Sequence, residues 1–399
     1  MVKRIFMFIL VLFSVIFFTT GCWDRVEIEE RGIVIASAID LVDKKDDKYT
    51  LQLTNQLVIP GRVGTPSEGP SSEKNPYINL SVAGESLSSL NNQMRQMTNQ
   101  NPFYQHLKVI IISEEVAKEP HLFTNIMDVY VRDYDMRRST RIVITDGESA
   151  SASSILDIEP ELNPLPGMYI EKLMDGVYDN ASAIEPVVLG DLHGDLLMDK
   201  SFILPQIELK GNFVEYQNAG VFQGYSNQLI GVLDLEETKG LALLTEKSPG
   251  GMLDVYVDGK LVELDMTEFR TNIEIKGQDK ANLKASADVE INANIIENFG
   301  DESLLNEAYE NKLEQQAEER AEQLMKQTID KLQGDFQVDV LGMSDILYRR
   351  HYDLWKEVED NWERGENYFS QMDIEVSAKV TIERVGASDS LRKQQEEAE

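Results

Sequence analysis

Alternation of apolar and polar residues is strongest in the last third of the chain, where it predicts long β-strands. Apolar side chains recur at every second position over 269–275, 283–295 and 374–382. A period of two places one face of a strand in a core and the other in water, as in an antiparallel sheet. We therefore predict a C-terminal antiparallel sheet.

A helical pattern lies between the last two of these strands. One apolar stripe runs from Leu305 to Leu332 and predicts a helix over 302–334 that Gly334 ends. The stripe is rich in alanine and polar residues, so a helix packed across the sheet is favoured over an intermolecular coiled coil. A second helical stretch is predicted at 343–362.

The first part of the chain mixes both periods. The apolar segment Arg31–Asp40 and the alternating segment Tyr49–Ile59 predict a β-hairpin. The spacing of Leu87, Leu90 and Met94 predicts an amphipathic helix. Further strands are predicted at 77–83, 107–113 and 141–145, and further helices at 114–131, 149–156 and 168–178.

These patterns predict a multi-domain α+β protein with mixed sheets, packed helices, and a C-terminal sheet crossed by a long helix. Pro160, Pro164 and Pro166 mark a break after the first domain. The expected units are a signal peptide (1–21), an N-terminal α+β domain (22–156), a connecting region (157–201), a middle β-rich domain (202–297), a C-terminal domain with the long helix and final strand (298–386), and a polar tail (387–399).

The N-terminus has the order of a secretory signal. Lys3 and Arg4 precede an apolar run over 5–18, which is too short to span a membrane, and Thr19-Thr20-Gly21-Cys22 follows. The small residues before Cys22 resemble the lipobox of bacterial lipoproteins, although Thr19 stands where leucine is usual. That resemblance implies that Cys22 receives a diacylglycerol on its thiol and an acyl group on its new N-terminus, a stable membrane anchor. A short signal-anchor with an incidental cysteine is the alternative.

Charge and cysteine content narrow the function. The net charge is −32, and loss of Lys3 and Arg4 with the signal makes it −34. Such a surface repels phosphate backbones, so nucleic-acid binding is excluded. Cys22 is the single cysteine, so the exported body has no internal disulfide.

One motif suggests metal chemistry. Gly190-Asp191-Leu192-His193-Gly194-Asp195 follows an apolar run and resembles the first metal-binding turn of calcineurin-like phosphoesterases. A two-metal site needs several more ligands, including histidines. The chain has four histidines: His106, His121, His193 and His351. We therefore interpret the motif as a polar turn in an interdomain segment, with a metal-dependent hydrolase ranked last among the possible functions.

The other candidates favour structural roles. We expect His106 to hydrogen-bond beside a buried strand and His121 to lie at a helix start. Asp254, Asp258 and Gly259 lack the alternating oxygen ligands of a calcium loop, and Asp258-Gly259 predicts the tight turn of a hairpin between 253–257 and 261–264. The acidic helix faces around 297–322 are expected to be solvated.

No motif of an enzyme is present. The sequence contains no Gly-x-Ser-x-Gly, phosphate-binding glycine loop or zinc-ligand cluster. We therefore expect no catalytic residues, no cofactor and no metal.

Several segments, in order along nearly the whole chain, resemble the Ger(x)C family, the lipoprotein C subunits of spore germinant receptors. The opening of that family is similar to Gly21–Ile28 and Ile33–Asp40. The remaining matching segments are Gly84–Leu87, His106–Ser113, Arg132–Arg137, Ala219–Phe222, Leu229–Gly231, Glu237–Gly240, the positions of Trp355 and Trp362, and Ile374–Glu383.

The resemblance implies a three-domain α+β fold and a non-catalytic subunit. Family members act with two integral membrane proteins, an A subunit and a transporter-like B subunit, in nutrient-triggered spore germination. The expected location is the outer face of the spore inner membrane, and Cys22 is the one functional residue carried over. A lipid-anchored extracytoplasmic solute-binding protein is the alternative, and it predicts two similar lobes about a cleft.

Overall fold

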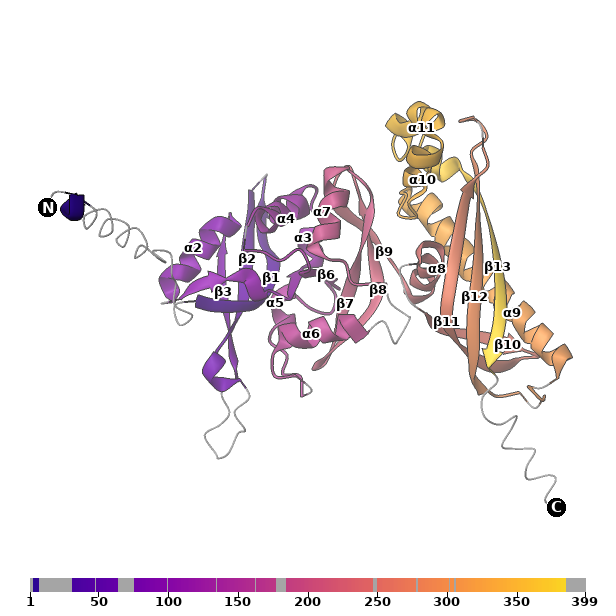
Figure 1. Cartoon of the computed structure of the whole chain (residues 1–399), viewed down its shortest axis with the longest axis horizontal. Coiled ribbons are helices and arrows are strands. Elements are labelled where there is room, and N and C mark those ends of the chain that lie inside the picture. The colour runs from indigo at the N-terminus through magenta and orange to yellow at the C-terminus, as the bar shows by residue number, and fades with distance from the viewer. Residues whose placement is uncertain are drawn as a thin grey trace, which may run out of the picture.

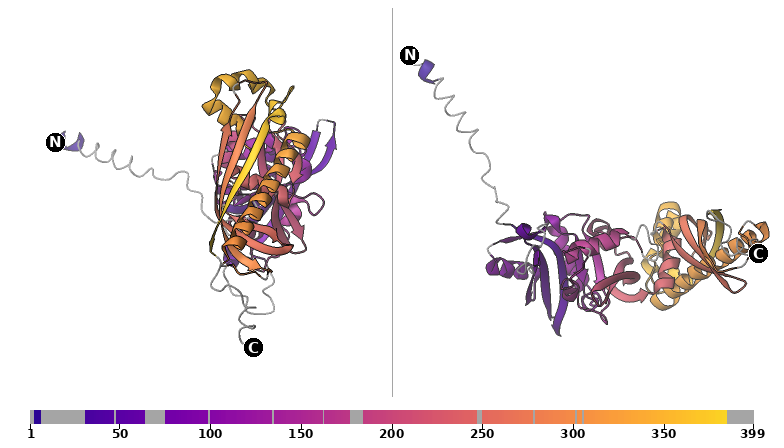
Figure 2. Two further views of the ribbon diagram at one scale, coloured as in Figure 1. Left: turned by 90° about the vertical axis from the view of Figure 1, so that its right-hand side faces the viewer. Right: turned by 90° about the horizontal axis from the view of Figure 1, so that it is seen from below.

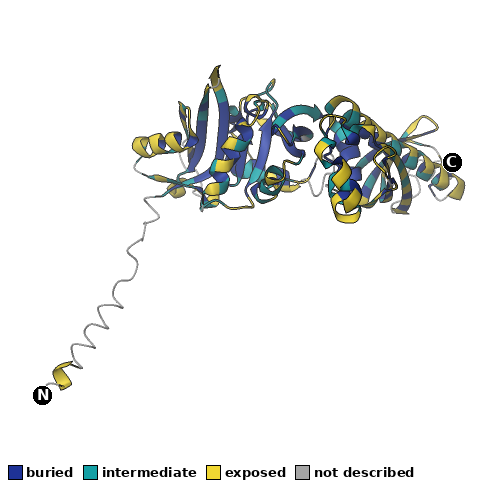
Figure 3. Ribbon diagram, turned by 90° about the horizontal axis from the view of Figure 1, so that it is seen from above, coloured by how far each residue is buried: buried dark blue, intermediate teal, exposed yellow. Residues whose placement is uncertain are grey.

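The chain forms two domains that lie end to end (Figure 1). The computed structural model describes residues 3–6 and 31–384, except 47, 64–74, 99, 134, 162, 177–183, 247–249, 278, 301 and 305. Each domain is built on its own β-sheet, whose covered face is buried (Figure 3). The fold is therefore α+β with mixed sheets and packed helices, as predicted.

The first sheet contains nine of the described strands, in the order β3-β2-β1-β5-β6-β7-β8-β9, with β4 paired to β1. They are β1 (Arg31–Lys45), β2 (Lys48–Val58), β3 (Tyr77–Gly84), β4 (Asn101–Phe103), β5 (Val109–Ile112), β6 (Arg141–Thr145), β7 (Phe202–Lys210), β8 (Phe213–Gln223) and β9 (Gln228–Leu233). The central strands β1, β5, β6 and β7 are parallel, and antiparallel strands flank them on both sides. The predicted first hairpin is β1–β2.

Helices cover both faces of this sheet. One face packs against α2 (Leu87–Met97), α3 (Glu114–Ala117), α4 (Leu122–Arg132) and α7 (Leu189–Leu197), and the other against α5 (Ala152–Ile155) and α6 (Pro166–Asp175). Two short 3-10 turns, η2 (Pro60–Arg62) and η3 (Tyr104–His106), complete the domain. Every residue of β5 is buried, because a strand covered on both faces has no solvent side. That is why this strand is a continuous apolar run.

The domain boundaries predicted from the sequence do not coincide with the limits of the two sheets. Strands β7 to β9 extend the first sheet, so the boundary expected near 201 falls inside it. The link is non-local: β6 pairs with β7 through Ile144–Gln206 and Thr145–Ile207. The region 157–201, expected to be a connection, supplies α6 and α7 to the two covered faces. The two sheets are separated after Leu233.

The second sheet has the order β10-β11-β12-β13, made of β10 (Gly251–Val257), β11 (Lys260–Ile275), β12 (Lys284–Asn298) and β13 (Asp373–Arg384). Asp258 and Gly259, at φ 52° and 75°, form the predicted tight turn between β10 and β11. The expectation of a fully antiparallel sheet is wrong for its last strand, since β13 runs parallel to β12. The helical stretch between them returns the chain to the same end of the sheet, which a hairpin cannot do.

The long helix α9 (Glu307–Asp330) crosses one face of the second sheet, as predicted (Figures 1 and 2). Its stripe of Leu313, Ala317, Ala321 and Leu324 is fully buried. The helix does not end at Gly334, because a π-helical turn (η5, Lys331–Phe336) continues it. The remaining elements are α8 (Leu235–Thr245), α10 (Met343–Arg350), α11 (Tyr352–Val358), η6 (Glu359–Asn361) and α12 (Tyr368–Gln371).

The acidic face of α9 corrects one expectation. Glu314, Glu318 and Glu322 are not simply solvated, because each accepts a hydrogen bond from the outer edge of β13. The bonds join the N–H groups of Ile382 (2.9 Å), Val380 (3.2 Å) and Ala378 (3.4 Å) to the three carboxylates in that order. The spacing of four along the helix matches the spacing of two along the strand, at about 6 Å in each. The glutamates thus occupy the donors that a neighbouring strand would use.

The two domains share an apolar core through α8. Leu241 and Leu244 of α8 lie in one buried cluster with Val221 and Leu233 of the first sheet and with most of the second domain's core. Asp234 and Glu237 form a capping box that begins α8. This continuous core fixes the two domains against each other.

Candidate functional site

The metal-turn motif is helical. Residues 190–195 lie in α7, where Leu189 and Leu192 are buried against the sheet, so the predicted polar turn is wrong. His193 Nδ1 lies 2.9 Å from a guanidinium nitrogen of Arg138. Within the described residues no group of three or more His, Cys, Asp or Glu side chains is placed to hold a metal ion. The phosphoesterase resemblance therefore lacks the strand-to-loop geometry that its chemistry requires.

The other sequence candidates have structural surroundings. His106 is exposed and its ring packs edge-on against Phe103 at 6.0 Å. His121 precedes α4 in the left-handed region, and its N–H donates to the Ser226 carbonyl. Asp258 pairs with Lys312 on α9. Cys22 lies outside the described residues, so its lipidation remains a prediction.

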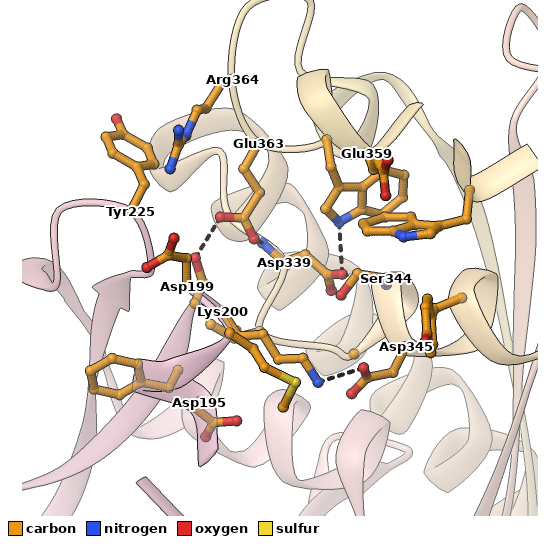
Figure 4. A pocket seen from close by; sticks show the side chains of 18 of the residues that line it. Asp195, Asp199, Lys200, Tyr225, Asp339, Ser344, Asp345, Glu359, Glu363 and Arg364 are labelled. Atoms are coloured by element: carbon orange, nitrogen blue, oxygen red, sulfur yellow. Dashed lines mark hydrogen bonds and ion pairs between the residues drawn. The ribbon is translucent and has the colours of Figure 1, made fainter. Parts of the chain in front are cut away.

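A concave site that combines polar and aromatic side chains lies between the two domains. It is a cavity of about 490 Å³ whose walls come from both (Figure 4). The first domain contributes the C-terminal end of α7, the start of β7, and Tyr225 in the β8–β9 turn, and the second contributes the segment from 339 to 364. Clefts at domain interfaces with a few convergent polar groups are common ligand sites.

A buried carboxylate, Asp339, and a partly buried one, Glu363, form the base of this pocket. Asp339 accepts hydrogen bonds from the N–H groups of Met343 and Ser344, at 3.1 and 2.7 Å, and from Trp362 Nε1 at 2.9 Å. Glu363 accepts from Ser201 Oγ at 2.6 Å and from the Asp339 N–H at 2.8 Å. Ser201 belongs to the first domain, so Glu363 links the domains at the base of the pocket.

Burial and the neighbouring charge of Asp339 raise the pKa of Glu363 to about 7, although the bonds from Ser201 and the Asp339 N–H, and the charge of Arg364, oppose the rise. Desolvation is the largest cause. The carboxyl of Glu363 therefore changes charge close to neutral pH.

Two cations also join the domains across the pocket. Lys200 Nζ lies 2.5 Å from Asp345 of α10. The Arg364 guanidinium stacks on the Tyr225 ring, 4.4 Å from its centroid. Figure 4 shows both pairs on opposite sides of Glu363. Each positive group that lines the pocket is thus already engaged.

Aromatic side chains make the remaining wall. Trp355 and Trp362 pack edge to face with ring centroids 5.9 Å apart. Tyr348, which also lines the pocket, packs against Tyr352 at 5.8 Å. Tyr348 and Met198 at the mouth are 57% and 60% exposed, respectively. The pocket therefore has hydrogen-bonded polar groups at its base, and both apolar and acidic side chains are exposed around it.

Sequence reasoning did not find this pocket. Ser201 and Glu363 are 162 positions apart, and no periodicity connects them. The one available signal was the pair Trp355 and Trp362, which we noted for the family resemblance alone. Both indole side chains line the pocket between the domains.

A second segment of the resemblance, 237–240, has a packing explanation. Lys239 lies between the carboxylates of Glu236 and Asp254, at 3.7 Å from each, and Arg320 of α9 pairs with the same two acids. A Cβ at Gly240 would overlap Thr328 Oγ1 and the Leu324 carbonyl oxygen of α9. These residues hold α8 against α9.

Two family models together match almost the whole chain after residue 23. Residues 24–209 match the spore germination protein N-terminal domain, and 217–386 match the C-terminal domain described as spore germination B3/GerAC-like. The chain belongs to the Ger(x)C family. It therefore has a role in spore germination.

Relatives of this Ger(x)C protein in Bacillus subtilis (strain 168) cover both domains. Spore germination protein YndF is 27% identical, over 92% of this chain and 93% of YndF. Spore germination proteins B3 and A3 are 24% and 25% identical, over 94% and 95% of this chain and 97% of each relative. The crystal structure of the GerBC protein superposes with a TM-score of 0.57 at 22% identity, covering 87% of this chain and 98% of GerBC, and so shares the fold.

Family membership agrees with the sequence segments on which the resemblance rested. A Cβ at Gly231 of one such segment would overlap the Phe336 ring, and Trp362 of another donates a hydrogen bond to Asp339. None of the described helices is long and apolar enough to cross a membrane.

Proposed function

We propose that this chain is the lipid-anchored, non-catalytic C subunit of a nutrient germinant receptor, acting with an A and a B membrane subunit at the outer face of the spore inner membrane. The single observation that carries the proposal is the family match along both domains, over residues 24–209 and 217–386. A binding and scaffolding role agrees with a site made of paired carboxylates and aromatic walls.

Chain length supports attachment close to the bilayer. Nine peptide steps separate Cys22 from Arg31, where β1 begins. Since an extended chain covers at most about 3.5 Å per residue, β1 starts within about 30 Å of a lipid on Cys22. β1 begins beside β4, and β4 contacts α2, at the end of the molecule remote from the second domain (Figure 1). The second domain would then project away from the membrane.

Co-purification tests the proposal. The C-terminus is tagged, spore membranes are extracted in mild detergent, and the captured proteins are identified by mass spectrometry. We expect two multi-pass proteins with the wild type and neither with Cys22→Ala, provided that the variant is made and exported. Capture of the chain alone from wild-type membranes would contradict the receptor assembly.

Solute binding is the second candidate, and the interdomain cavity favours it. Against it stands the architecture, because the domains differ in fold and share one core rather than closing about a cleft. Calorimetry of the purified protein with amino acids and sugars distinguishes the two. Micromolar binding of a nutrient would favour the solute-binding protein.

A further inference from the structure

The pocket between the domains carries an excess of negative charge. Seven carboxylates and two cations line it. The carboxylates are Asp195, Asp199, Asp339, Asp345, Glu359, Asp360 and Glu363. Lys200 pairs with Asp345, and Lys356, which lies outside the lining, pairs with Glu359. Arg364 stacks on Tyr225, so the remaining carboxylates still leave an excess of negative charge. A concave site between low-dielectric walls strengthens such a field.

Two of these acids are available to an incoming group. Asp199 and Asp360 are exposed, and in the part of the chain that the structure describes neither side chain has an ion-pair or hydrogen-bond partner. Asp199 comes from the first domain and Asp360 from η6 of the second. A cation in the pocket would therefore meet carboxylates from both domains.

The walls indicate the class of cation. The carboxylates do not form a cluster that could ligate a metal ion among the described residues. Trp355, Trp362 and Tyr348 instead present aromatic surface, which attracts ammonium and guanidinium groups and their apolar stems. The volume of about 490 Å³ is that of a site for a small organic molecule or one long side chain.

We propose that the interdomain pocket binds a compact organic cation, an ammonium or guanidinium group on a short apolar stem. The cation belongs either to a free amino compound or to a lysine or arginine side chain of a partner protein. Because its contacts come from both domains, an occupant would tie them together beside the Ser201–Glu363 hydrogen bond. This site does not depend on the receptor role, since it is complete within one chain.

The first test compares two probes of equal stem on the wild-type protein. Full-length protein in detergent micelles is titrated with butylammonium and with butyrate at constant ionic strength, by calorimetry and tryptophan fluorescence. We expect butylammonium to bind at least about tenfold more tightly than butyrate. No binding by butylammonium at 10 mM, or equal binding of both probes, would overturn the proposal.

Paired variants locate the site. Asp199→Asn with Asp360→Asn removes the two free charges, and Asp353→Asn with Glu357→Gln removes two exposed charges from α11 that do not line the pocket. We expect the first pair to weaken butylammonium binding about tenfold and the second less than twofold. Equal weakening by both pairs would mean general surface attraction and would reject the site. The probe comparison stands even if a variant folds poorly.

A third titration identifies the source of the cation. Acetyl-Ala-Lys-Ala-amide presents the same ammonium on a peptide backbone. Peptide binding tenfold tighter than butylammonium supports a partner's side chain, and the reverse supports a free amino compound. Failure of both probes contradicts the proposal while leaving co-purification with membrane partners untouched.

Discussion

The two sheets of this protein differ in how many of their faces are exposed to solvent. The central strands of the first sheet are covered by helices on both faces, so that Val109 to Ile112 are all buried. The second sheet is covered on one face by α8 and α9, and side chains such as Asn272 and Glu290 remain exposed on the other. The first sheet is thus stabilised by packing on two sides, and the second by one helical layer.

The two domains also differ in how many helices cover the sheet. In the second domain a single helix, α9, both covers the sheet and caps the outer edge of β13 with three glutamates. In the first domain six of the described helices, α2 to α7, share the covering. We therefore expect truncation of a core side chain to lower the free energy of unfolding most in the first domain. In the second domain, we expect substitutions that affect the packing or contacts of α9 to have the larger effect.

The largest effect is expected for Ile111→Ala in β5. Ile111 is fully buried, whereas Ile273 of β11 is only partly buried. We expect Ile111→Ala to lower the free energy of unfolding by about 3 kcal/mol and Ile273→Ala by about 1 kcal/mol, because the cavity left at 111 cannot be filled by water or relaxation. Urea unfolding of the two variants measures both. Equal losses of unfolding free energy in the two variants would contradict the expected difference in packing between the two sheets.

A pair of helix glycines gives the next largest effect, with opposite signs. At Gly240 of α8 an added Cβ overlaps α9, whereas nothing lies within 4 Å of a Cβ at Gly194 of α7. We expect Gly240→Ala to destabilise by about 2 kcal/mol through overpacking. Gly194→Ala should stabilise by about 0.5–1 kcal/mol through helix propensity. Thermal unfolding followed by calorimetry tests the pair, and a harmless Gly240→Ala would show that α8 and α9 are not in close contact.

Removing the glutamates that cap β13 should have a smaller effect on stability. For Glu314, Glu318 and Glu322 changed together to alanine, we expect a loss of about 1–2 kcal/mol, since three hydrogen bonds are lost while helix propensity rises. The bared strand edge should also promote self-association, which light scattering detects. The same three positions changed to glutamine keep an acceptor oxygen, so that variant should associate no more than the wild type. Self-association of both the alanine and the glutamine variants would point to the loss of negative charge, and not of the hydrogen bonds, as the cause.

The smallest effect concerns pH and the junction of the domains. The pKa of Glu363 is raised from 4.5 to about 7, so the folded protein binds this proton more tightly than the unfolded chain. Its contribution to stability is therefore largest at low pH and declines as pH rises from about 4.5 to about 7. Glu363→Gln should remove that part of the decline, seen as a smaller difference in Tm between pH 5 and pH 7.5. An unchanged difference would mean that Glu363 is ionised throughout. Ser201→Ala is the control, because it removes the hydrogen-bond donor and keeps the titrating group.

Local patterns predicted much of the fold. The alternation along β11 and β12, the Asp258-Gly259 turn and the stripe of α9 each depend on neighbouring residues and were found in the structure. The placement of β7 in the first sheet rests on pairs more than 60 positions apart, and the direction of β13 depends on a long crossover. Such pairings leave no periodic trace in the sequence.

The pocket was beyond sequence reasoning for the same reason. Lys200 and Asp345 are 145 positions apart and meet only because α8 joins the domains. The glutamates of α9 illustrate a second limit, since an acidic helix face has the same pattern whether it meets water or the N–H groups of a strand edge. The sequence shows that this face of α9 is polar, but the tertiary packing determines which groups it contacts.

Germination itself tests the central claim most directly. Spores carrying the wild-type chain, a deletion or Cys22→Ala are exposed to nutrients, and germination is followed by the loss of optical density. If the chain is a lipid-anchored receptor subunit, the deletion and Cys22→Ala spores should both fail to respond to the same nutrient to which wild-type spores respond. Normal germination of Cys22→Ala spores with a stably produced protein would contradict the anchor, and normal germination of the deletion with every nutrient tried would contradict the receptor role.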